Sequence, residues 1–235
     1  GAIDVGFVAG VDLDNADGDN NAGTGAETGG FGALTVSSTA GAITLGLGAR
    51  SATSSFGSIT ARTGDAIVAN ESAVDTLSSG NLTLTFLAGS GAGQSGVGSI
   101  SSLLGSTKTG TLSLNGRFGD IGAVDLSTEA YVDTDTAAGA GEAPVVIKAG
   151  DIAVNASFWG NHGEIRLKTV DSSALPGTQA QVPGTVTDLG TINATLAFSG
   201  VLLPTSPAAG VIASTDRGNL TLNLTAGIDE DAGSD

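Results

Sequence analysis

The sequence has no Cys and no Met, and it is poor in charged and aromatic residues. Without Cys no disulfide can form, so the fold depends on packing, and the redox state of the compartment cannot be inferred. The chain has only 8 Lys and Arg residues but 24 Asp and Glu residues, which gives a net charge of −16. Binding to nucleic acid phosphates or to anionic lipid needs clustered Lys and Arg, so this balance argues against both partners. No run approaches the ~18 consecutive apolar residues of a membrane helix, so we expect no membrane insertion of the mature chain.

The chain is rich in apolar residues and in Gly. Apolar residues make up 40% of the 235, and Gly alone accounts for 38. This is enough to fill a core, and the absence of a three-residue Gly period excludes collagen. Because the chain starts Gly1-Ala2-Ile3 and lacks Met, we expect that a signal segment has been removed. A neutral surface rich in Ser, Thr, Gly and Asn is typical of exported β proteins, so we expect an extracellular or cell-surface location.

Short runs in which apolar residues alternate with Thr, Ser or Asn recur along the chain, bounded by Gly, Asp or Ser. Side chains of a strand alternate between its two faces, so these runs predict β-strands with one buried face. No long stretch has the 3.6-residue period of an amphipathic helix. The predicted strands are Ala33–Ser37, Ala42–Leu47, Ser58–Arg62, Ala66–Asn70, Asn81–Leu87, Thr111–Asn115, Ala123–Ser127, Pro144–Ala149, Asp151–Phe158, Glu164–Thr169, Thr185–Leu189, Thr191–Phe198, Gly210–Ala213 and Asn219–Thr225.

Three of these strands share the order Gly, polar, Leu, hydroxyl, Leu, polar: they lie in Gly80–Thr85, Gly110–Asn115 and Gly218–Asn223. The leucines are expected to point inward and the polar residues outward. The copies are unevenly spaced, whereas a solenoid repeats at a fixed period. The sequence therefore favours an antiparallel β-sandwich, jelly-roll or Ig-like, with a β-solenoid as the alternative.

Strand signals continue on both sides of every candidate loop, so residues 31–228 are expected to form a single β domain. An N-terminal strand is predicted over residues 1–13, an acidic Gly-rich tether over 14–30 and an acidic tail over 229–235. The small acidic stretch Thr128–Glu142 is predicted to be a loop.

The N-terminal strand has the longest alternating pattern in the chain. Its apolar face is formed by Ile3, Val5, Phe7, Ala9, Val11 and Leu13. One interpretation makes it the first strand of the domain's own sheet. The other makes it an inter-subunit strand that completes the sheet of a neighbouring copy, with Phe7 as the anchor. Such an exchange is head-to-tail and produces a polymer of the chain with itself.

Two family resemblances accompany these patterns. Ile3–Leu13 and the ending Gly218–Gly227 resemble secreted β-sandwich filament proteins of the TasA and camelysin group and archaeal pilins that exchange donor strands. This resemblance implies a structural subunit of an extracellular filament, pilus or surface layer that polymerises by donor-strand exchange. Gly32–Ser38 and Gly41–Gly46 resemble rungs of the β-helix of haemagglutinin-type adhesins. The alternative function is accordingly a monomeric cell-surface adhesin or carbohydrate-binding β domain.

A calcium site is one hypothesis for the acidic stretch after this strand, where four carboxylates lie within eight residues: Asp12, Asp14, Asp17 and Asp19. Calcium takes six to eight hard oxygen ligands from a flexible loop. The stretch is not an EF-hand, because Leu13 occupies the position of the first Asp and Thr24 that of the bidentate Glu. The other interpretation is a solvated acidic linker. No other cofactor is indicated.

Six N-glycosylation sequons occur, more than the two or three that chance would place among 11 Asn. Their Asn residues are Asn70, Asn81, Asn155, Asn193, Asn219 and Asn223. Modification of these residues would agree with an exported protein.

Catalytic signals are scarce. The only His is His162, no Gly-x-Ser-x-Gly nucleophile elbow is present, and metal-binding His usually occur in groups. We therefore expect no enzyme activity, and we interpret His162 as a turn residue near Trp159.

Overall fold

The structure is a computed structural model, and it describes the chain in separate ranges. These are residues 1–9, 30–49, 55–64, 66–68, 76–78, 80–87, 99–129, 131–133, 145–147, 149–158, 160–170, 190–198, 210–215 and 218–226. In these ranges every regular element is a strand, which confirms the all-β prediction. No helix in the described ranges is long and apolar enough to cross a membrane.

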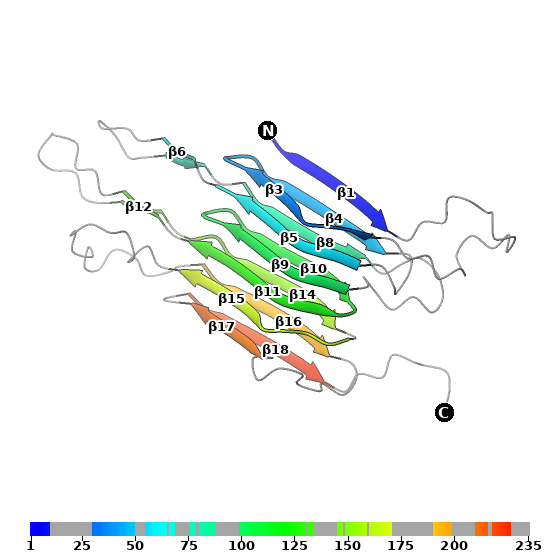
Figure 1. The fold of residues 1–235 in the computed structure, drawn as a ribbon. Helices are drawn as coiled ribbons and strands as arrows, with labels where there is room; N and C mark the ends of the chain where they lie inside the picture. The colour runs from blue at the N-terminus through cyan, green and yellow to red at the C-terminus, as the bar shows by residue number, and fades with distance from the viewer. Residues whose placement is uncertain are drawn as a thin grey trace, which may run out of the picture.

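Two seven-stranded sheets make up the body of the molecule (Figure 1). The first sheet has the order β1 (Ile3–Ala9), β4 (Ile43–Ala49), β8 (Leu82–Leu87), β10 (Leu112–Phe118), β14 (Ile152–Phe158), β16 (Ile192–Phe198) and β18 (Leu220–Ala226). The second has the order β17 (Val211–Thr215), β15 (Ile165–Val170), β11 (Ile121–Glu129), β9 (Ser99–Thr107), β5 (Ser55–Thr63) and β2 (Gly30–Phe31), with β3 (Leu34–Ser38) also paired to β5.

Every strand pair within these two sheets is parallel, so the expected antiparallel β-sandwich is wrong. The chain passes from a strand of the first sheet to one of the second and then returns one position further along the first. Strands that follow one another in the sequence therefore do not pair with each other in these two sheets. Each passage from the first sheet to the second and back adds one coil to a solenoid-like stack. Figure 1 shows β1 at one end of the stack and β17 and β18 at the other.

Two hairpins extend from one side of the stack (Figure 1). One joins β6 (Ala66–Val68) to β7 (Thr76–Ser78), and the other joins β12 (Tyr131–Asp133) to β13 (Val145–Ile147). Both are antiparallel, and each is inserted where the chain returns from the second sheet to the first. The predicted loop Thr128–Glu142 thus contains the end of β11 and all of β12.

Connections of different length explain the uneven spacing of the strand copies, and the two hairpins lie in two of the longer connections. A Gly precedes each first-sheet strand by two residues, at positions 1, 41, 80, 110, 150, 190 and 218. The short coils take 30 residues, from Gly80 to Gly110, and 28 residues, from Gly190 to Gly218. The other steps are 39 or 40 residues. The repeat is therefore regular in its strands and irregular only in the connections between them.

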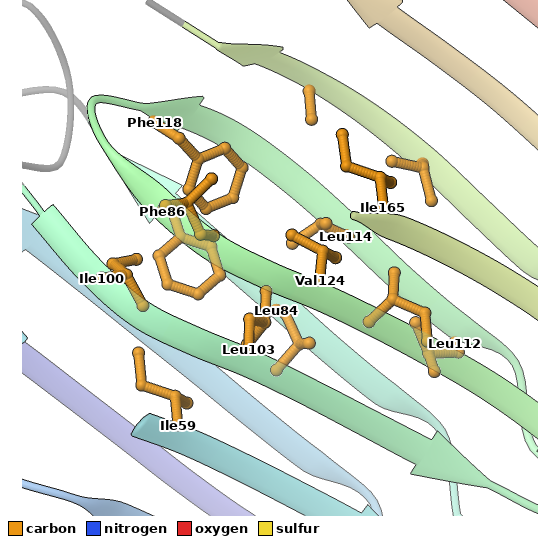
Figure 2. Packing of buried hydrophobic residues seen from close by; sticks show 14 of the residues in the cluster. Ile59, Leu84, Phe86, Ile100, Leu103, Leu112, Leu114, Phe118, Val124 and Ile165 are labelled. Atoms are coloured by element: carbon orange, nitrogen blue, oxygen red, sulfur yellow. The ribbon is translucent and has the colours of Figure 1, made fainter. Parts of the chain in front are cut away.

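The core lies between the two sheets and is filled by the alternate side chains of each strand (Figure 2). It is almost wholly aliphatic, apart from the rings of Phe56, Phe86, Phe118, Phe158 and Phe198. Phe118, Phe158 and Phe198 stack in register on neighbouring strands, with ring centroids 5.2 and 5.3 Å apart. These three coils thus contribute the same side chain at the same depth.

Hydroxyl groups and glycines hold the corner where the second sheet leads back to the first. The hydroxyl of Thr63 donates to the carbonyl of Gly80, and that of Thr128 to the carbonyl of Gly150, both at 2.7 Å. These Thr side chains are buried, so the bonds satisfy polar groups that have no access to water. Glycine is required because a Cβ at Gly150 would overlap the carbonyl of Gly110 in the preceding coil.

Candidate assembly surfaces at the two ends of the stack

Large apolar side chains are exposed at the ends of the stack. Within the described ranges, the exposed large hydrophobic residues are Phe7 at 38%, Ile212 at 45%, Leu220 at 45% and Leu224 at 54%. Phe7 lies in β1, Ile212 in β17, and both leucines in β18. Among the strands that the structure describes, β1 and β18 are the outermost of the first sheet, and each pairs with a neighbour on one side only. Leu220 and Leu224 occupy positions that are buried in the preceding coils and are uncovered here because no further strand pairs with β18 among the described residues.

The predicted inter-subunit strand lies in the sheet of its own chain. β1 pairs with β4 in parallel over seven residues, from Ile3 opposite Ile43 to Ala9 opposite Ala49. Ile3 and Val5 pack against the core of the same chain. Val11 and Leu13 lie outside the described residues. The structure thus places β1 as the terminal strand of its own sheet, and the donation of β1 to a neighbour stays a prediction.

A repeated hydrogen bond joins successive strands of the first sheet. The first residue of each strand donates its N–H to the carbonyl that precedes the next strand: Ile3 to Ala42, Ile43 to Asn81, Leu82 to Thr111, Leu112 to Asp151, Ile152 to Thr191 and Ile192 to Asn219. The N···O distances are 2.8 or 2.9 Å throughout. The next donor in this series is the N–H of Leu220 in β18, beyond which the chain provides no further coil in the described ranges.

Side chains of Asn and Asp reinforce this ladder at two coils, which are separated by one coil without such a side chain. The Oδ1 of Asn81 accepts the backbone N–H of Thr111 at 3.0 Å. Two coils further on, the Oδ1 of Asp151 accepts the N–H of Thr191 at 2.7 Å. Asn219 holds the corresponding position before β18 and is exposed. The sequence does contain a signal for this series: an Asn or Asp lies between the first-sheet strand and the Gly two residues before that strand. Because the coils differ in length, these residues do not recur at a fixed period.

The sequons gather on one surface. Asn155, Asn193 and Asn223 lie in β14, β16 and β18, and all three are exposed at outward positions of the first sheet. Asn81 and Asn219 are also exposed and directly precede strands of the same sheet. Asn70 lies outside the described residues. The outer face of the first sheet is therefore the surface on which the predicted glycans would stand.

The predicted calcium ligands Asp12, Asp14, Asp17 and Asp19 lie outside the described residues. Within the ranges that the structure covers, no group of three or more His, Asp or Glu side chains could hold a metal ion. The calcium site therefore stays a prediction about the segment that follows β1.

His162 lies at the edge of the core rather than in a cleft. Its ring packs against Phe158 and Phe198, with centroids 5.7 and 5.0 Å apart. Its Nδ1 lies 2.8 Å from the carbonyl oxygen of Gly163, and a bridge joins its backbone to Ile121. This is a packing environment, in which the imidazole lies against two successive rings of the phenylalanine stack. Trp159 is outside the described residues.

Comparisons with protein-family models, with curated proteins and with solved structures give no match to the chain. Any functional conclusion therefore depends on the geometry alone.

Proposed function

We propose that this chain is a non-catalytic structural subunit of an extracellular filament or surface layer, and that its copies join end to end by strand addition. The observation that carries the proposal is the confinement of the exposed large hydrophobic side chains, among the residues described, to the terminal strands β1, β17 and β18. Apolar surface that gathers at a sheet edge marks a site of association.

The edge formed by β18 supports this proposal. Natural edge strands are usually protected by charged residues, proline or bulges. β18 reads Leu-Thr-Leu-Asn-Leu-Thr-Ala, without a charge, a proline or a glycine. Its backbone is extended and pairs in register with β16 over seven residues, so the opposite edge of β18 is straight enough to accept another strand.

Strand addition at these ends does not require β1 to leave its own sheet. The two outermost strands of the first sheet run in the same direction, because every pair between them is parallel. The β1 edge of one copy and the β18 edge of another are different surfaces, so the contact is head-to-tail and does not close on itself. Repetition of this contact produces a filament.

Electron microscopy of the purified chain tests the proposal, together with two lysine substitutions in β18. Leu224→Lys places a charge at a core-facing position that would be buried in the junction. Asn223→Lys is the matched control, since it adds the same charge one residue away on the outward face. We expect filaments from the unchanged chain and from Asn223→Lys but not from Leu224→Lys, with the same β-type circular dichroism in all three. Monodisperse particles of the unchanged chain at high concentration would refute the proposal.

A monomeric adhesin or carbohydrate-binding module is the second candidate. The outer face of the first sheet favours it, because Thr85, Asn115, Asn155, Thr195 and Asn223 form one polar row across five adjacent strands. Such a row offers donors and acceptors at the regular spacing of the strands, about 4.8 Å. This function predicts binding to a cell or glycan surface by single particles, and its loss when Asn155→Asp is introduced at the centre of the row.

A further inference from the structure

We infer that the next copy adds its β1 to β18 in the register that continues the coil-to-coil pairing, with Ile3 of the second copy opposite Leu220 of the first. The inference rests on the proposed end-to-end assembly and specifies its partner surface, its direction and its register. A second copy of this chain is the occupant, because the free edges of β18 and β1 complete each other as successive coils do within the chain.

The pairing of strands within the chain fixes the register. Throughout the first sheet, the first apolar residue of a strand lies opposite the first apolar residue of its neighbour, as Ile192 lies opposite Leu220 and Ile3 opposite Ile43. β1 and β18 both have seven residues with apolar side chains at the first, third and fifth positions. In the continued register these positions meet in pairs: Leu220 with Ile3, Leu222 with Val5, and Leu224 with Phe7.

The backbone supplies a specific bond at the start of the junction. The ladder of six N–H donors inside the chain ends at Ile192, which donates to the carbonyl of Asn219 at 2.9 Å. One further step requires the N–H of Leu220 to donate to the carbonyl of Ala2 in the next copy. Ala2 is the equivalent of Ala42, Asn81 and the other acceptors, because it is the residue immediately before a first-sheet strand.

Asn219 adds a side-chain bond at the same place. Asn81 and Asp151 each accept the N–H of the equivalent residue one coil further on. Asn219 follows Asp151 in this alternating series, and the equivalent residue one coil further on is Ala2 of the next copy. The geometry therefore assigns Asn219 as a positioning residue, whose Oδ1 accepts the Ala2 N–H and holds the register.

The junction is weaker than the contacts between coils inside the chain. β4, β8, β10 and β16 each pack against the second-sheet strand before them and the one after them. At the junction, β18 is preceded by β17 and β1 is followed by β2 and β3, so the described residues provide no second-sheet strand between the copies. The apolar pairs are thus less completely covered there, and filaments should separate into subunits at a lower urea concentration than that which unfolds the subunit.

Paired cysteines test the register directly, since the chain has no Cys of its own. Asp4→Cys with Thr221→Cys places two thiols opposite each other across the inferred junction, at the separation that a disulfide accepts. Within one chain the two positions lie at opposite edges of a seven-stranded sheet, about 29 Å apart, so the disulfide can form only between copies. Gly6→Cys with Thr221→Cys is the matched control, displaced by two residues.

We expect the in-register pair to form a ladder of covalent oligomers on a non-reducing gel after mild oxidation, and the displaced pair to form at least 10-fold less. Filaments with no ladder, or with the ladder in the displaced pair, would overturn the register and leave the proposed assembly standing. The absence of both filaments and ladder would overturn both.

A second measurement examines Asn219 alone. Asn219→Ala removes the acceptor and should raise the critical concentration for assembly about 10-fold, while Asn219→Asp should restore it, because Asp151 makes the same bond inside the chain. Equal critical concentrations for Ala and Asp at position 219 would overturn the positioning role.

Discussion

Removal of one ring from the phenylalanine stack should destabilise the subunit far more than removal of the exposed ring of Phe7 in the terminal strand β1. Phe158 is 1% exposed and stacks between Phe118 and Phe198, with centroids 5.2 and 5.3 Å away. Phe158→Ala leaves a cavity that neighbouring coils cannot fill, because each coil is held to the next by its hydrogen-bond ladder. Truncation of a buried Phe costs about 3–5 kcal/mol. Both stacked contacts of the ring are lost as well, which places the expected value at the upper end of this range.

The matched control is Phe7→Ala, in which the same side chain is removed where it is 38% exposed. We expect a loss of about 1 kcal/mol or less in the free energy of unfolding of the subunit, because much of the ring is already in contact with water. Urea unfolding followed by circular dichroism measures both variants, under conditions in which the chain is monomeric. A loss below about 1 kcal/mol for Phe158→Ala, or equal losses for the two variants, would refute the account of a continuous packed stack.

Three further predictions follow from the corners and the charge of the chain. Gly150→Ala should destabilise the subunit by about 1–3 kcal/mol in urea unfolding, since its Cβ would overlap the preceding coil, whereas Gly6→Ala should be near neutral because the space there is open. Thr128→Val should cost about 1–3 kcal/mol because it removes the donor to a buried carbonyl, while Thr169→Val should be neutral or stabilising because that buried hydroxyl has no hydrogen-bond partner; equal effects would contradict this. Raising NaCl from 0.1 to 1 M shortens the Debye length from about 10 to about 3 Å, so filament mass measured by sedimentation should increase as repulsion within a chain of charge −16 is screened.

The alternation of apolar and polar residues was enough to predict the all-β structure and several strands. Asp151–Phe158 and Thr191–Phe198 correspond to β14 and β16 within one residue, because the inward side chains of both strands are buried in strict alternation. β9 was missed because Ser101 and Ser102 interrupt the alternation of apolar and polar residues. The core position of Gly105 also lacks a side chain that would mark it as buried.

Strand direction could not be predicted from the same pattern, because a period of two is identical in parallel and antiparallel sheets. The direction depends on the path of the connections, and those contain insertions such as β6–β7 and β12–β13 that lengthen some coils by about ten residues. A fixed period was therefore absent from the full sequence although it exists in the strands. Two signals could have revealed the repeat: the Gly two residues before each first-sheet strand, and the Asn or Asp immediately before some of these strands.

The parallel arrangement also changes what the terminal strand has to do. In an antiparallel sandwich, head-to-tail assembly needs a groove left by a missing strand and a terminal segment that leaves its own subunit to fill that groove. In a stack of parallel coils every first-sheet strand presents the same two edges, and each coil already binds the next through both. The interface between copies can thus be the interface between coils, used once more at Leu220 and Ile3. β1 would then have both roles that the sequence analysis considered. It would be the first strand of its own sheet, and its open edge would pair with the last strand of a neighbouring copy.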